Sequence, residues 1–78
     1  MSESWRLNAL KSVWCKNREW NTPYMEKVLP ILERAAAYAE DHWNDYSEES
    51  TRVVRASNDA LMALEREYYP ENTEEFMN

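Results

Sequence analysis

Apolar residues recur at helical spacing along most of this chain, and three segments share the pattern. The first predicted helix begins after Ser2 or Ser4, either of which is a good N-cap, and runs to about Trp20. Its apolar side is broad, which suits a helix that packs against two neighbours. The positions that define this side are Leu7, Leu10, Val13 and Trp14.

The second predicted helix shows the strongest periodicity and extends from Pro23 to about Tyr46, with Thr22 as N-cap. Its apolar positions fall within about two-fifths of the helix circumference. They are Tyr24, Val28, Ile31, Leu32, Ala35, Tyr38, Ala39, His42, Trp43 and Tyr46. Because Pro30 cannot donate a backbone hydrogen bond to the Glu26 carbonyl, we expect a kink or a break there.

The third predicted helix begins after Ser47 as N-cap, runs to about Tyr69 and ends at Pro70. Glu48 and Glu49 suit its first turn, where carboxylates interact favourably with the helix dipole. Its core-facing positions are Val53, Val54, Ser57, Ala60, Leu61, Leu64 and Tyr68. The fold class expected is all-α, a compact bundle of three helices, or of four if Pro30 breaks the second.

Composition supports this assignment and narrows the function. The 78 residues include no glycine, three prolines and one cysteine. A chain of this length suffices for one domain, which we assign to residues 1–70, and residues 71–78 form an acidic tail. Without glycine, the chain has no Gly-rich phosphate-binding loop and no EF-hand loop. A single cysteine forms no internal disulfide, and no signal-like or membrane-spanning apolar run is evident, so the expected location is cytoplasmic.

The residues that could carry catalysis are few. Cys15 and His42 are the candidates for a nucleophile and its base, but a core histidine bonded to a tyrosine or to the backbone is the alternative for His42. A carboxylate metal site in a bundle uses Glu-x-x-His, and Ala39 occupies the position where that glutamate would stand. We therefore expect a protein that is not an enzyme, with no catalytic residues, metal site or cofactor.

Charge is distributed unevenly along the chain, which has a formal net charge of −6. Residues 1–34 carry six basic and four acidic side chains, whereas residues 35–78 carry three basic and eleven acidic ones. Five of the acidic residues lie in a stretch of ten without any lysine or arginine. These residues, which we call the acidic corner, are Glu40, Asp41, Asp45, Glu48 and Glu49.

The acidic corner is the predicted site for a protein partner with a basic surface. Asp41 and Asp45 would form a like-charge pair near the negative end of the second helix dipole, at a cost of about 0.2–0.5 kcal/mol for each effect. A nucleic-acid-handling protein is one such partner, and the chain would then be an acidic inhibitor or nucleic-acid mimic. The net charge disfavours direct binding to nucleic acid or to an anionic membrane. A solvated, solubilising corner is the alternative.

A second surface is predicted on the third helix, where Met62 and Tyr69 are seven residues apart and Arg55 and Arg66 flank them. Exposed Met, Tyr and Arg are enriched in protein interfaces. This face would form the seam of a homodimer, making the chain a self-associating structural or adaptor bundle, or the tail with Phe76 and Met77 would cover it.

Overall fold

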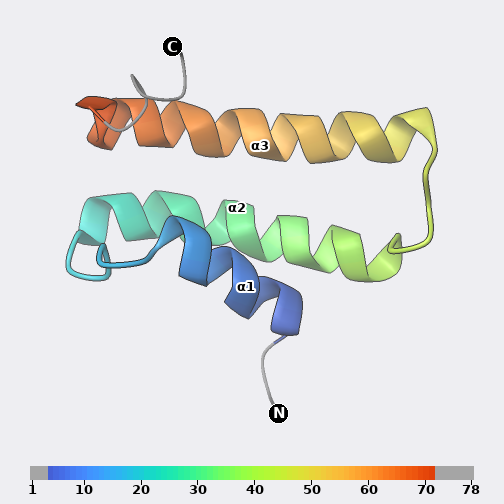
Figure 1. The fold of residues 1–78 in the computed structure, drawn as a ribbon, viewed down its shortest axis with the longest axis horizontal. Coiled ribbons are helices and arrows are strands. Elements are labelled where there is room, and N and C mark those ends of the chain that lie inside the picture. The colour runs from blue at the N-terminus through green and yellow to red at the C-terminus, as the bar shows by residue number, and fades with distance from the viewer. Residues whose placement is uncertain (1–3, 72–78) are drawn as a thin grey trace.

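The computed structural model describes residues 4–71, which fold into three helices and contain no strand. Helix α1 (Trp5–Trp14) crosses one side of α2 (Thr22–Asp41), and α3 (Glu48–Tyr68) runs antiparallel along the other (Figure 1). In this part of the chain the backbones of α1 and α3 do not approach each other, so α2 is the central element. The all-α, three-helix prediction is confirmed.

Side-chain caps explain where the helices begin. The hydroxyls of Ser4 and Ser47 accept hydrogen bonds from backbone N–H groups in the first turns of α1 and α3, as predicted. For α2 the predicted N-cap is wrong by one residue. The cap is Asn21, whose side-chain oxygen accepts a 3.3 Å hydrogen bond from the Tyr24 N–H, and Pro23 occupies the second helical position.

Two helices end earlier than the sequence predicts. Helix α1 stops at Trp14 rather than Trp20, and the chain turns at Asn17, whose φ of 62° lies in the left-handed region that asparagine tolerates. Helix α2 stops at Asp41 rather than Tyr46, because the following loop makes its own turn into α3. The last aromatic residues assigned to the core of α2 therefore lie outside the helix.

Helix α2 continues through Pro30, so the fourth helix does not form. Pro30 is exposed, and the carbonyl group that loses its N–H donor is that of Glu26, also an exposed residue that water can reach. Val28 and Leu32 lie on either side of the proline in sequence and are fully buried on the opposite side of the helix. Packing of this apolar side offsets the missing hydrogen bond.

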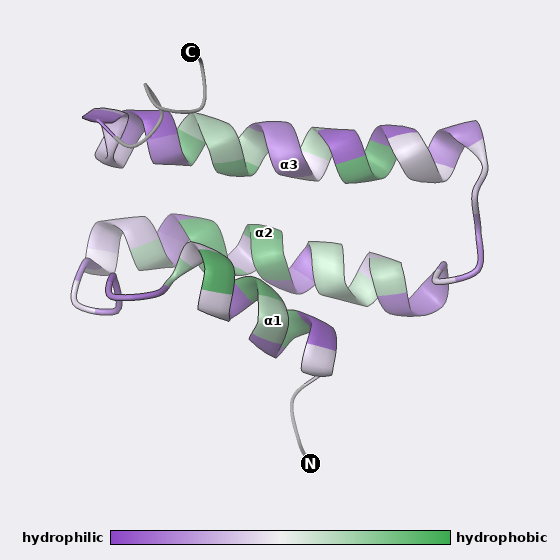
Figure 2. Ribbon diagram, in the orientation of Figure 1, coloured by the Kyte–Doolittle hydropathy of each residue, from purple (hydrophilic) through white to green (hydrophobic). Residues whose placement is uncertain are grey.

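The core is concentrated at one end of the molecule, where the α1–α2 turn meets the end of α3. Tyr24, Val28 and Leu32 on α2 are fully buried and pack against Leu61 and Leu64 on α3. In Figure 2, hydrophobic residues, coloured green, recur along the ribbons of both α2 and α3. Toward the other end, the buried residues of these helices are the small Ala36 and Ser50. None of the helices described is long and apolar enough to cross a membrane.

An ion pair between the half-buried Arg18 and the buried Glu65 connects the α1–α2 turn to α3 at the packed end. Arg18 binds Glu65 through two parallel hydrogen bonds, and the one between Nη2 and Oε2 measures 2.7 Å. The guanidinium group lies 3.9 Å from the centre of the Tyr69 ring and donates to the Tyr24 hydroxyl, which in turn donates to the Trp14 carbonyl. The hydrogen bond to Glu65 raises the pKa of Arg18, which keeps it fully charged.

Breaking this pair is expected to unfold much of the protein. In Arg18→Met, the Glu65 carboxylate stays buried without a partner, which costs about 3–5 kcal/mol, as much as a domain of this size usually has. In Arg18→Met/Glu65→Leu no charge is buried, so most of the stability returns. Urea unfolding followed by circular dichroism measures both. Lys27→Met, which removes the exposed Lys27–Glu67 pair, is the control and should change little.

Candidate protein-binding surface

The acidic corner lies at the less packed end of the molecule, where α2 leads into α3 (Figure 1). Glu40 and Asp41 are the last two residues of α2, Asp45 is in the loop, and Glu48 and Glu49 form the first turn of α3. All five side chains are exposed. Within residues 4–71, no ion pair joins any of them to a lysine or arginine. The structure thus gathers these carboxylates on a single corner.

Asp45 has a structural role that the sequence analysis missed. Its Oδ1 accepts a 2.9 Å hydrogen bond from the backbone N–H of Ser47, the N-cap of α3. This bond lowers the pKa of the Asp45 carboxyl below its ordinary value of 3.8. Because α2 ends at Asp41, Asp41 and Asp45 are not a pair on one helix, and the predicted repulsion between helical neighbours does not arise. Glu40 and Asp41 remain without a local structural reason.

Exposed aromatic side chains adjoin the acidic corner. Trp43 and Tyr46, predicted to be buried, are exposed because α2 ends before them. His42 is also exposed; it stacks on the Tyr38 ring at 3.9 Å, and its Nδ1 lies 3.0 Å from the Tyr38 carbonyl oxygen. Of the two alternatives for His42, the bond to the backbone is present, but the histidine lies outside the core.

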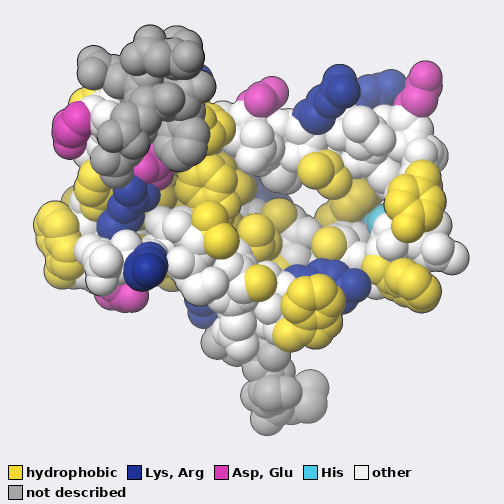
Figure 3. Space-filling model, in the orientation of Figure 1, with side chains coloured by type: hydrophobic (Ala, Val, Ile, Leu, Met, Phe, Trp, Pro, Cys, Tyr) yellow, Lys and Arg dark blue, Asp and Glu magenta, His cyan; other side chains and the backbone are white. Residues whose placement is uncertain are grey.

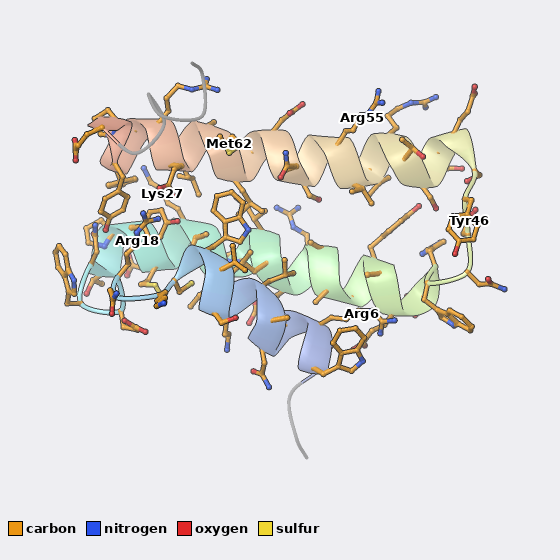
Figure 4. The ribbon with its side chains drawn as sticks, viewed as in Figure 1. Arg6, Arg18, Lys27, Tyr46, Arg55 and Met62 are labelled. Atoms are coloured by element: carbon orange, nitrogen blue, oxygen red, sulfur yellow. The ribbon has the colours of Figure 1, made fainter. Side chains whose placement is uncertain are left out.

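A groove opens between α1 and α3 on the face seen in Figure 3, with α2 as its floor. It consists of two adjoining cavities of about 630 and 230 Å³ that share Tyr38, Ala39 and Val54. Arg6 and Tyr46, labelled in Figure 4, lie toward the acidic end and line the larger cavity. Most of the surface that lines the groove is apolar. The groove is open because the small side chains of α2 leave the space between α1 and α3 unfilled.

The predicted surface on α3 is divided by the structure. Arg55 and Arg66 are exposed and Met62 is half-buried, but Tyr69 faces the core. The Tyr69 ring packs edge-on against Tyr24 at 5.3 Å, and its hydroxyl accepts a 2.8 Å hydrogen bond from the Asn21 side chain. The expectation that Tyr69 lies away from the core is therefore wrong. The tail residues Phe76 and Met77 lie outside the described residues.

The candidate catalytic residues are not brought together. Cys15 is buried in the core cluster that also contains Tyr24 and Val28, and burial raises the pKa of its thiol, which disfavours the reactive thiolate. His42 directly follows the last residue of α2, about 21 Å along the helix axis from Val28. The two side chains cannot form a dyad. Among residues 4–71, no group of three or more His, Cys, Asp or Glu side chains is arranged to hold a metal ion.

Glu65 and the exposed apolar residues of α1 are the features that sequence reasoning missed. Glu65 lies between Leu61 and Tyr68 in the apolar arc of α3, and a carboxylate in such a position indicates a buried cationic partner. Val13 was predicted to lie on the packing side of the first helix, yet it is exposed, as is Trp5 on the same helix. Comparison of the chain with protein-family models, curated proteins and solved structures finds no significant match.

The hydrogen bond of Asp45 predicts a pH dependence of stability. Because the pKa of Asp45 is lower in the folded protein than its ordinary 3.8, its contribution is complete above pH 3.8 and is lost as the pH falls through the folded-state pKa. In Asp45→Asn the amide oxygen can still accept from Ser47 but does not titrate. Thermal unfolding as a function of pH should show a shallower acid-side loss for this variant, and equal slopes would contradict the assignment.

Proposed function

We propose that the protein is a non-catalytic binding module that recognises a protein with a basic surface. The observation that carries the proposal is the acidic corner, in which five exposed carboxylates are neutralised by no basic side chain in the described chain. Such a concentration of one charge steers a cationic partner and speeds its association. The exposed Trp43 and Tyr46 beside it are residue types that supply binding energy in protein interfaces.

Glu40 and Asp41 are the strongest support within the corner. Both lie at the C-terminal end of α2, where the helix dipole disfavours negative charge, and the last turn has no basic residue to compensate. Asp45, Glu48 and Glu49 stabilise the start of α3, and this role requires no partner. Since the fold gains nothing from carboxylates at the end of α2, a basic partner is the reason we infer for them.

The specific form of the proposal is an acidic inhibitor that occupies the nucleic-acid site of its target. Glu26, Glu33 and Glu40 are exposed and recur every seven residues, so they extend the negative surface along α2 at intervals of about 10.5 Å. A nucleic-acid-handling protein offers a basic groove that such a surface can fill. The free thiol of Cys15 suits a reducing compartment such as the cytoplasm.

Charge reversal at the end of α2 tests the proposal. The variant Glu40→Lys/Asp41→Lys should lose the partners that the wild-type protein captures from its native host at low salt. It should also be at least as stable as wild type, because lysine interacts favourably with the C-terminal end of the helix dipole. Affinity capture, with circular dichroism to check folding, measures both effects. A captured partner should release bound nucleic acid when the wild-type protein is added.

The matched control is Glu19→Lys/Asp59→Lys, which changes the net charge by the same amount at two exposed positions that belong neither to the acidic corner nor to the row of glutamates along α2. It should retain the partner. If both variants keep their partners and high salt does not elute them, the proposal is wrong. If the partner is eluted equally from both variants, the net charge of the protein, rather than the acidic corner, determines binding.

A further inference from the structure

Helix α1 carries an apolar stripe that faces away from the core. Trp5, Ala9 and Val13 are spaced four residues apart and fall within an arc of about 80°. All three are exposed, Trp5 to 68% and Val13 to 70%. On its other side α1 packs Leu10 and Trp14 against the core. A helix that is apolar on both sides is usually buried on both, so the stripe needs a covering surface.

The groove between α1 and α3 is a second unfilled apolar surface on the same side of the molecule. Three of the hydrophobic side chains that line it are exposed: Trp43 to 68%, Tyr46 to 88% and Val54 to 61%. Leu10 and Trp14 line its narrower part, and Arg6 lines its wider part, so the groove begins where the stripe on α1 ends. Figure 3 shows hydrophobic side chains gathered across this face.

The exposed area is of the size that a stable contact requires. At the fractions above, Trp5, Trp43 and Tyr46 alone present on the order of 500 Å². A standard protein interface buries about 800 Å² on each partner. The stripe and the remainder of the groove lie next to these aromatic residues. A partner that covers both surfaces at once would therefore bury enough area for a stable complex.

The charges on this face favour a second copy of the chain as the partner. Helix α1 carries Arg6 and Lys11 and no acidic residue, whereas the corner at the end of the groove is wholly acidic. Arg6, Arg55 and Asp45 line the same cavity, so the surface carries both signs, and its cations can face the acidic corner of a second copy. Two copies with a net charge of −6 each would repel through most other faces.

We propose that the chain forms a symmetric homodimer in which the Trp5–Ala9–Val13 stripe of each copy packs into the groove of the other. A two-fold axis allows both contacts because the stripe and the groove adjoin on one face, and it closes the assembly at two copies. Arg6 then faces the partner subunit's Asp45. The dimer would bury Trp43 and Tyr46 and engage Asp45, which the proposed function assigns to the basic partner, but it does not rest on that function, since Glu40 and Asp41, the strongest support for it, do not line the groove.

Light scattering coupled to size exclusion tests the dimer, which should have about twice the 9.4 kDa mass of the chain. Val13→Glu should raise the dissociation constant at least about tenfold, because it places a charge in an apolar contact. Asn8→Glu adds the same charge to the polar side of α1 and should leave the dimer intact. Trp43→Ser should dissociate the dimer, whereas Trp20→Ser, at an equally exposed tryptophan away from the groove, should not.

Cysteine cross-linking tests how the copies pair. A mixture of Ala9→Cys and Val54→Cys chains should form a disulfide-linked heterodimer under mild oxidation, because the stripe of one copy meets the groove of the other. Ala9→Cys alone should not cross-link. The native Cys15 is buried in both chains, so it does not compete.

A mass of one chain at hundreds of micromolar would overturn the proposal, as would an Asn8→Glu variant that dissociates as readily as Val13→Glu. Efficient cross-linking of Ala9→Cys to itself would indicate that two stripes pack on each other, which also contradicts the stripe-in-groove arrangement. Circular dichroism of each variant ensures that loss of the dimer is not loss of the fold. If a monomeric variant still captures a basic partner, the proposed function holds whether or not the chain forms a dimer.

Discussion

The ion pair between Arg18 and Glu65 is the interaction on which the arrangement of the three helices depends. Among the described residues α1 and α3 share no backbone contact, so the turn after α1 must be joined to α3 by side chains. Arg18 does this from inside a cluster of tyrosines, where Tyr24 and Tyr69 exclude water and accept its remaining interactions. A pair enclosed in this way is costly to break, because Glu65 left alone would be a buried charge.

Packing is consequently uneven along α2. At the end near Arg18, large side chains fill the space between α2 and both neighbours, whereas at the other end the buried positions are occupied by Ala36 and Ser50. The hydroxyls of Tyr38 and Ser50, 3.2 Å apart, connect α2 to α3 there. The open end is also where the acidic corner and the exposed aromatic residues lie. One end of the molecule thus stabilises the fold, and the other end carries the candidate binding surface.

Capping residues in the sequence predicted where the helices begin to within one residue, whereas Pro30 did not divide α2. Ser4, Ser47 and Pro70 marked helix boundaries correctly, or within a residue or two, because capping depends on neighbouring backbone groups. The ends of α1 and α2 were missed because apolar spacing continued past them. Asn17, in a left-handed conformation, lies in the turn that follows α1, and Asp45 accepts a hydrogen bond from Ser47 in the loop that follows α2. Each of these signals comes from a single residue, whereas the apolar spacing of the whole segment predicted that the helix would continue.

The sequence by itself determined the all-α class, the composition of the acidic corner and the exposure of its carboxylates, since these follow from helical periodicity and the cost of burying charge. Only the tertiary structure decided that Glu65 is buried, that Tyr69 faces inward and that an open groove separates α1 from α3. These features depend on how far apart the helices pack and on contacts such as Arg18 with Glu65, 47 residues apart. Periodicity specifies which side of a helix is apolar, but it does not specify how completely its neighbours cover that side.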